Sequence, residues 1–185
     1  MSRAFVDEDA SGDREAGAPE IKIPIPPGSR NYLTPEGAEA LSRELHELSA
    51  VERPRLLAEI GAGADAGSSP DRDAGGKLRR RLGEVDRRIA YLYAMSSLAE
   101  VMELPTPEGR DRVKFGAWVR VRNRAGLELE YKIVGVDEAD PARGWIGWAS
   151  PVARSLMGRK AGDETKVKLP SGEESLWILD IDYRR

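Results

Sequence analysis

Residues 61–76 read GAGADAGSSPDRDAGG and separate two helical patterns. The segment contains five glycines and a proline, which oppose a helix because Gly costs roughly 1 kcal/mol and Pro roughly 3 kcal/mol relative to Ala in a helix interior. It also contains Asp65, Asp71 and Asp73, which outnumber its one basic residue, Arg72. The sequence therefore predicts the acidic tip of a helical hairpin.

The helix before the tip has a clear beginning. Thr34, Pro35 and Glu36 supply an N-cap, a first-turn proline and a negative charge near the positive end of the helix dipole. We expect this helix to run from about 35 to 60 and to be kinked by Pro54, which lacks a backbone N–H. Its seam approximates a heptad at Leu41, Leu45, Leu48, Glu52 and Leu56.

The helix after the tip has a regular apolar seam. Its apolar residues step by 4, 3, 4 and 3, as in a two-stranded coiled coil, at Leu78, Leu82, Val85, Ile89 and Leu92. Two such seams joined by a short polar segment predict an antiparallel hairpin. At about 1.5 Å per residue, an arm of about 25 residues would be roughly 37 Å long, so we expect it to project from the body.

A run of basic residues surrounds the second seam. We interpret it as a nucleic-acid-binding patch suited to a phosphate backbone, and the alternative is a solvated charged face. The patch comprises Lys77, Arg79, Arg80, Arg81, Arg87 and Arg88.

The pattern changes to a period of two at Val113, which indicates strands. The sequence predicts four or five antiparallel strands, with one short helix begun by Ser150 and Pro151. The expected organisation is an acidic disordered tail and Pro-rich linker over 1–30, a coiled-coil hairpin over 31–104 with its tip at 61–76, a linker over 105–111, and a sheet domain over 112–185.

Composition narrows the class of protein. The net charge is −3, cysteine is absent, and His46 is the single histidine, which argues against a disulfide framework and a zinc site. No apolar run approaches the roughly 20 residues of a membrane span. We expect a cytoplasmic, monomeric protein without a membrane partner.

Several stretches in this order resemble the bacterial Gre transcript-cleavage factors, nearer the GreB branch. They are LTPEGAEAL, ERPRLL, RRLGEVDRRIAYL, RVKFGAWVRVRNRAG, YKIVGVDEAD and SPVARSLMGRKAGDE. The resemblance implies an α+β fold, in which a coiled-coil hairpin precedes an FKBP-like antiparallel sheet domain. It implies an arm that enters the secondary channel of RNA polymerase, near the nascent RNA 3′ end. The docking residues it implies are Asp137, Glu138, Asp140, Ser150, Pro151 and Ala153.

The tip departs from the family's pattern, Asp-x-x-Glu-Asn-x-Glu/Asp-Tyr. Its leading Asp position is Ser68, its Glu position is Asp71, and its Tyr position is Gly75, while Asp73 lies one place before the later acidic position. The resemblance implies that tip carboxylates share a Mg²⁺ of the polymerase, so the protein needs no cofactor or metal of its own and is not itself an enzyme. Mg²⁺ is usually held by only one or two protein carboxylates. Because Ser68 replaces one of the two leading carboxylates and Asp71 is shorter than the Glu of the pattern, we expect weak or lost transcript cleavage.

Three alternatives remain open. Asp71 and Asp73 together could give a fully active cleavage factor. The sheet domain could be a prolyl isomerase with a pocket lined by Phe115, Tyr131, Trp145 and Trp148. The hairpin could also be a plain coiled-coil interaction module.

Overall fold

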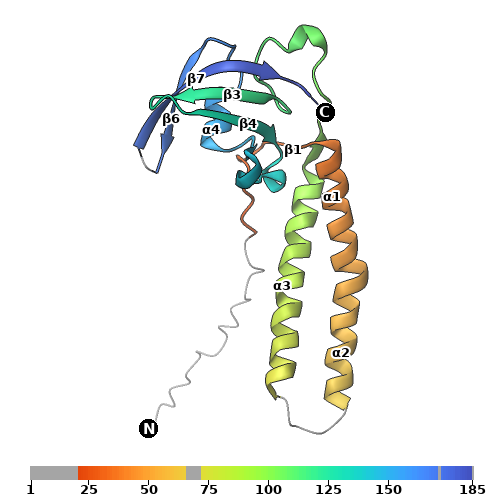
Figure 1. Ribbon diagram of the computed structural model, residues 1–185. Helices are drawn as coiled ribbons and strands as arrows, with labels where there is room; N and C mark the ends of the chain where they lie inside the picture. The colour runs from red at the N-terminus through yellow and green to blue at the C-terminus, as the bar shows by residue number, and fades with distance from the viewer. Residues whose placement is uncertain (1–20, 66–71, 171, 185) are drawn as a thin grey trace, which may run out of the picture.

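A helical hairpin projects from a small curled sheet, and the two parts meet at the base of the hairpin (Figure 1). The computed structural model describes residues 21–65, 72–170 and 172–184. Within them the α+β class, the hairpin, the sheet and the short helix are confirmed. The expected tail over 1–20 lies outside the described residues.

The element bounds are as follows. The helical segments are α1 (Pro35–His46), η1 (Glu47–Glu52), α2 (Arg53–Asp65), α3 (Arg72–Ser97), η2 (Pro107–Gly109), η3 (Val136–Glu138), η4 (Pro141–Arg143) and α4 (Pro151–Leu156). The strands are β1 (Asn31–Leu33), β2 (Ala99–Val101), β3 (Trp118–Asn123), β4 (Glu128–Val134), β5 (Trp145–Gly147), β6 (Glu164–Leu169) and β7 (Gly172–Asp182).

The first helix begins as expected and continues past its proline. The Thr34 hydroxyl accepts a hydrogen bond from the Gly37 N–H at 3.0 Å, and Pro35 occupies the first turn. Pro54 cannot donate a backbone hydrogen bond, and the chain just before it is π-helical, with the Arg53 N–H donating to Leu48 O. The expected disturbance is therefore a π-helical segment, η1, within a helix that does not stop.

The two helices extend further into the glycine-rich segment than predicted. α2 ends at Asp65 rather than near 60, and α3 begins at Arg72, so Gly61, Gly63 and Gly75 are helical. Once a helix is established, each added residue gains a backbone hydrogen bond without repeating the cost of nucleation, which offsets the glycine penalty. Residues 66–71, the centre of the predicted tip, lie outside the described residues.

The predicted seams pack against one another. Leu41, Leu56, Val85 and Leu92 are buried, with exposed fractions of 8%, 3%, 2% and 1%. The other seam positions are half-buried. The antiparallel coiled-coil arrangement of the hairpin is therefore confirmed (Figure 1).

The base of the arm has a small core of its own. Ile25 and Leu33 pack there with Leu41, Leu92 and Met95, so the Pro-rich segment lies against the body. The parallel strands β1 and β2 close this base. The fully buried Asn31 side chain donates to Met95 O at 3.2 Å and so satisfies a carbonyl near the end of α3.

The five-stranded sheet has the order β5-β4-β3-β7-β6. Its pairings are antiparallel except that β5 joins β4 in parallel, which corrects the expectation of a wholly antiparallel sheet. The segment containing η3 and η4 returns the chain to the middle of β4, where Trp145 pairs with Lys132, so β5 runs in the same direction as β4. Gly144 permits the return, because it has φ +72° and an added Cβ would clash with Glu130 O.

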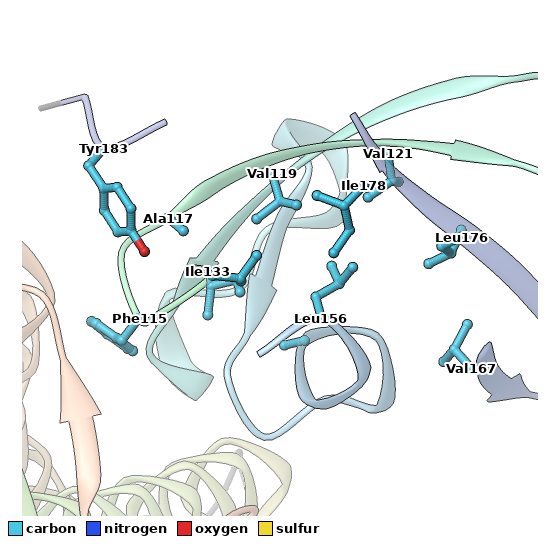
Figure 2. Packing of buried hydrophobic residues seen from close by; sticks show 12 residues of the cluster. Phe115, Ala117, Val119, Val121, Ile133, Leu156, Val167, Leu176, Ile178 and Tyr183 are labelled. Atoms are coloured by element: carbon cyan, nitrogen blue, oxygen red, sulfur yellow. The ribbon is translucent and has the colours of Figure 1, made fainter. Parts of the chain in front are cut away.

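The main core lies between the sheet and α4 (Figure 2). Val119, Ile133 and Ile178 from three strands face Leu156 of α4, and all four are at most 1% exposed. The strand expected to begin at Val113 begins at Trp118, because residues 114–117 form a turn in which Gly116 has φ +82°. Val113 and Phe115 are nevertheless buried, as their apolar character predicts.

Candidate functional site

Two of the predicted basic residues brace the arm. Arg81 pairs with Glu52 across the hairpin at 2.7 Å, and Arg88 donates two hydrogen bonds to Glu44 at 2.7 and 2.8 Å. Both carboxylates lie on the first helix, so each pair joins one helix to the other. These two guanidinium groups are therefore engaged within the protein, although Arg81 is 51% and Arg88 41% exposed. Their expected contact with a phosphate backbone stays a prediction.

The Arg88–Glu44 pair shifts the pKa of both of its members. The hydrogen bond from Arg88 lowers the pKa of Glu44, and the same bond raises the pKa of Arg88. The Arg88 guanidinium also lies over the Tyr91 ring, 5.1 Å from its centre. The side chains of Arg88 and Glu44 are 41% and 42% exposed, so solvent screens their attraction.

The remaining arginines of the patch face solvent. Arg79, Arg80 and Arg87 are exposed on α3, and none of them forms an ion pair or hydrogen bond with another described residue. At 100° per residue they point away from the seam formed by Leu78, Val85 and Leu92. The predicted patch thus consists of two bracing residues, Arg81 and Arg88, and an open face formed by Arg79, Arg80 and Arg87. Lys77 is exposed and has an interaction of its own.

Glu138, a predicted docking residue, joins the sheet domain to the start of the arm. Its carboxylate accepts hydrogen bonds from the Thr34 N–H at 2.9 Å, from the Thr34 hydroxyl and from the Gly135 N–H at 3.3 Å. Gly37 makes room for it, because an added Cβ would overlap its side chain. A carboxylate at a helix N-terminus also interacts favourably with the helix dipole.

Asp137 makes a second bond between the sheet domain and the arm, and we call the contacts Thr34–Glu138 and Tyr91–Asp137 together the joint. It accepts a hydrogen bond from the Tyr91 hydroxyl at 2.8 Å, and burial together with this bond raises the pKa of Tyr91. Tyr91 was not among the predicted site residues, although its place outside the seam of α3 indicates a second contact face of that helix. Asp137 itself remains exposed and accessible.

The other predicted docking residues differ in accessibility. Asp140 accepts from the Ala142 N–H at 3.0 Å and caps η4, and Ser150 accepts from the Ala153 N–H at 3.2 Å and caps α4. Pro151 is exposed. Ala153 is fully buried in the main core, so its side chain packs internally and does not offer a contact to a partner.

A cleft of about 300 Å³ lies at the same joint. It is lined by Thr34, Glu44, Arg88, Asp137 and Glu138, together with Lys132 and Trp145 from the sheet. The structure therefore brings one part of the predicted patch, Arg88, together with two of the predicted docking residues. The open face of Arg79, Arg80 and Arg87 lies further along α3, toward the tip.

The predicted tip carboxylates are not all described. Ser68 and Asp71 lie outside the described residues, and Asp73 lies in the first turn of α3, where only the backbone is described. Among the residues with described side chains, no cluster of His, Cys, Asp and Glu could hold a metal ion. The proposed sharing of a Mg²⁺ therefore stays a prediction from the sequence.

The aromatic residues proposed for an isomerase pocket do not meet in one cavity of the described chain. Phe115 is 7% exposed and belongs to the main core, whereas Trp145 lines the joint cleft. Trp148 makes an edge contact with Tyr32 at 5.2 Å, between the two cores. Tyr131 is half-buried on β4 beside the main core. The arrangement gives the isomerase alternative no support.

The fold and the joint define a class: an arm-bearing α+β protein whose helical hairpin is hydrogen-bonded at its base to a sheet domain. Residues 31–101 match the family model described as the transcription elongation factor N-terminal domain, and residues 107–183 match the one described as the GreA/GreB C-terminal domain. The chain therefore belongs to the GreA/GreB family of transcription elongation factors, nearer the GreB branch. It is accordingly a regulatory factor and not an enzyme in its own right.

Similar proteins cover most of the chain. A transcription elongation factor GreB of Yersinia pestis is 41% identical over 83% of this chain and 90% of its own length. The GreB of Pasteurella multocida is 42% identical over 84% of this chain and 98% of its own. A crystal structure of the GreA factor homologue Gfh1 of Thermus thermophilus is 20% identical over 83% of this chain and 99% of its own, with a TM-score of 0.39.

No helix in the described part of the chain is both long enough and apolar enough to cross a membrane.

Proposed function

We propose that this protein is an elongation regulator that binds bacterial RNA polymerase and inserts its helical arm into the secondary channel. The observation that carries the proposal is the projecting hairpin, fixed at its base by Thr34–Glu138 and Tyr91–Asp137. A rigid joint directs a distant tip, because a small angular error at the base becomes a large displacement at the end of the arm. The proposal places the protein in the cytoplasm, as a monomer, at the site of transcription.

The tip limits what the inserted arm does. Stimulation of cleavage needs carboxylates that hold a Mg²⁺ of the polymerase beside the phosphate oxygens of the transcript, and a serine cannot supply that charge. Ser68 occupies the leading acidic position and Asp71 the second. We therefore propose that the arm occupies the channel near the nascent RNA 3′ end with weak or lost cleavage. Full activity through Asp71 and Asp73 is the competing outcome.

The open arginine face supplies a contact for nucleic acid within this proposal. Arg79, Arg80 and Arg87 have no carboxylate partner in the described chain, so their charges are available to phosphate. Arg81 and Arg88 serve the arm itself. For docking, the exposed Asp137 and Pro151 are the accessible members of the predicted set, with Asp140 and Ser150 beside them.

A binding experiment with core RNA polymerase tests the proposal. We expect the wild-type protein to bind at micromolar concentration and Asp137→Lys to weaken binding. Because Asp137 also accepts a bond from Tyr91, Tyr91→Phe is the control that removes that bond and keeps the carboxylate. Absence of wild-type binding removes the proposal, and equal weakening by both variants assigns Asp137 to the joint alone.

A further inference from the structure

A row of alternating cations and indoles crosses one end of the sheet. Trp118 on β3 lies opposite Lys132 on β4, and Lys132 lies opposite Trp145 on β5. Since side chains alternate along a strand, these three lie on the face opposite Val119 and Ile133, away from α4. Arg184 and Arg143 extend the row at its two ends, and we name these five residues the Trp–cation row.

The rings hold the cations close. The Lys132 Nζ lies 5.5 Å from the centre of the Trp118 ring and 4.4 Å from that of Trp145. The guanidinium carbons of Arg184 and Arg143 lie 4.3 Å from Trp118 and 3.6 Å from Trp145. The ring quadrupole attracts each cation, and these contacts restrict side chains that would otherwise be mobile.

The arrangement favours carboxylates over nucleic-acid bases. A base stacks on an open aromatic face, whereas each indole here already has two cations against it. A guanidinium that rests on a ring keeps its N–H edge available for a carboxylate. Arg184 is paired with Glu130 at 2.6 Å, but Lys132 and Arg143 have no ion-pair partner within residues 21–65, 72–170 and 172–184.

A cleft of about 670 Å³ adjoins the row. Three cations, Arg110, Lys132 and Arg184, line it together with the apolar side chains of Met102, Leu104 and Phe115, and the carboxylates of Glu36 and Glu103 also line it. The cleft therefore offers an apolar surface beside a small excess of positive charge. This combination suits a protein segment in which an apolar side chain is flanked by carboxylates, and Trp and Arg are the residues most enriched in the energetic centres of protein interfaces.

Charge and position indicate the partner. Residues 112–185 contain 14 Lys and Arg against 11 Asp and Glu, although the whole chain has a net charge of −3. The row also continues the predicted docking surface, because Asp140 caps the turn that ends at Arg143 and its backbone pairs with Trp145. We infer that the Trp–cation row docks an acidic segment of RNA polymerase. The inference rests on the proposed function, which names the polymerase as partner.

The test measures binding of the full-length protein to core RNA polymerase at low and at physiological salt. The variant Lys132→Gln/Arg143→Gln removes the two unpaired charges and should weaken binding roughly tenfold, the loss expected at the centre of an interface. It should also make the affinity less dependent on salt. Arg124→Gln, an exposed arginine in the β3–β4 turn, is the matched control and should leave both quantities unchanged.

The possible results distinguish the role of the Trp–cation row from the proposed binding of RNA polymerase by the whole protein. Wild-type protein that fails to bind polymerase overturns both, whereas a double variant with wild-type affinity and salt dependence overturns only the role of the row. If circular dichroism shows that the double variant is misfolded, the single variant Arg143→Gln, which changes an exposed side chain, replaces it in the same binding assay. Wild-type affinity and salt dependence of that variant would then overturn the role of the row. A labelled single-stranded oligoribonucleotide that binds the wild type but not the variant would assign the row to RNA and contradict the inference.

Discussion

The arm and the sheet domain are stabilised in different ways. In the sheet domain, buried side chains from several strands and α4 form one continuous core. The arm has a narrow seam with few fully buried residues, and exposed ion pairs such as Arg53–Asp86 and Arg81–Glu52 cross it. Apolar burial contributes most of the free energy of folding, whereas exposed ion pairs contribute little. The sheet domain and the joint therefore contribute most of the stability of the protein, and the sequence of the distal arm can change with little loss of stability.

This difference bears on the tip. A segment that adds little to the core can change its chemistry without unfolding the protein, so Ser68 and Gly75 are tolerable at positions where the family's pattern has Asp and Tyr. The same substitutions in the sheet core would be selected against through stability. The contrast between the two parts can be measured.

The largest effect is expected in the sheet core. Leu156→Ala removes a fully buried side chain that faces Val119 and Ile178 (Figure 2), and it should lower the free energy of unfolding by about 2–5 kcal/mol. The matched change on the arm, Leu57→Ala, affects a side chain that is 43% exposed and should change it by about 0.5 kcal/mol or less. Urea unfolding followed by circular dichroism measures both. Equal changes in the free energy of unfolding would refute the claim that the sheet core contributes more to stability than the arm.

The joint should show an intermediate effect. Glu138→Gln replaces a carboxylate that accepts bonds from Thr34 and Gly135, and the loss should cost about 1–3 kcal/mol because the weaker acceptor leaves half-buried groups poorly satisfied. Glu39→Gln, an exposed change on the same helix α1, is the control. A Glu138 variant as stable as the Glu39 variant would mean that the joint is held by apolar contacts alone.

The smallest effect is expected for the pair that braces the arm. A double-mutant cycle with Arg88→Gln and Glu44→Gln should give a coupling of about 0.3–1 kcal/mol at neutral pH, since both side chains are partly exposed. The folded-state pKa of Glu44 is lowered from its ordinary value of 4.5. The coupling is therefore fully present above that value and is lost as the pH falls through the lowered pKa. A coupling that persists in strong acid would show that the pair acts through packing.

Much of the architecture follows from local patterns. The seams of the hairpin, the Thr34 cap, the period-two strands and the helix at Ser150 are all set by residues close together in the sequence, and the structure has each of them. The parallel placement of β5 was missed because it depends on a return turn at Gly144 whose close approach to Glu130 is a tertiary contact.

The candidate site was less predictable, for the same reason. The bonds Thr34–Glu138 and Tyr91–Asp137 join residues 104 and 46 positions apart, and no local pattern in the sequence shows which of these residues pair. The division of the basic patch likewise depends on carboxylates of the opposite helix, Glu44 and Glu52, that lie within reach only after the hairpin closes. The terminal position of the hairpin tip could be located from the sequence, but its chemistry depends on Ser68 and Asp71.

The most direct test of the account is transcript cleavage in stalled elongation complexes at a protein concentration that saturates binding. We expect the wild type to bind and to release little dinucleotide, and Ser68→Asp to increase cleavage because it restores the missing carboxylate. Asp71→Asn in the Ser68→Asp background should abolish that gain. Efficient cleavage by the wild type, with no increase from Ser68→Asp, would contradict the claim that this arm reaches the channel with an impaired tip.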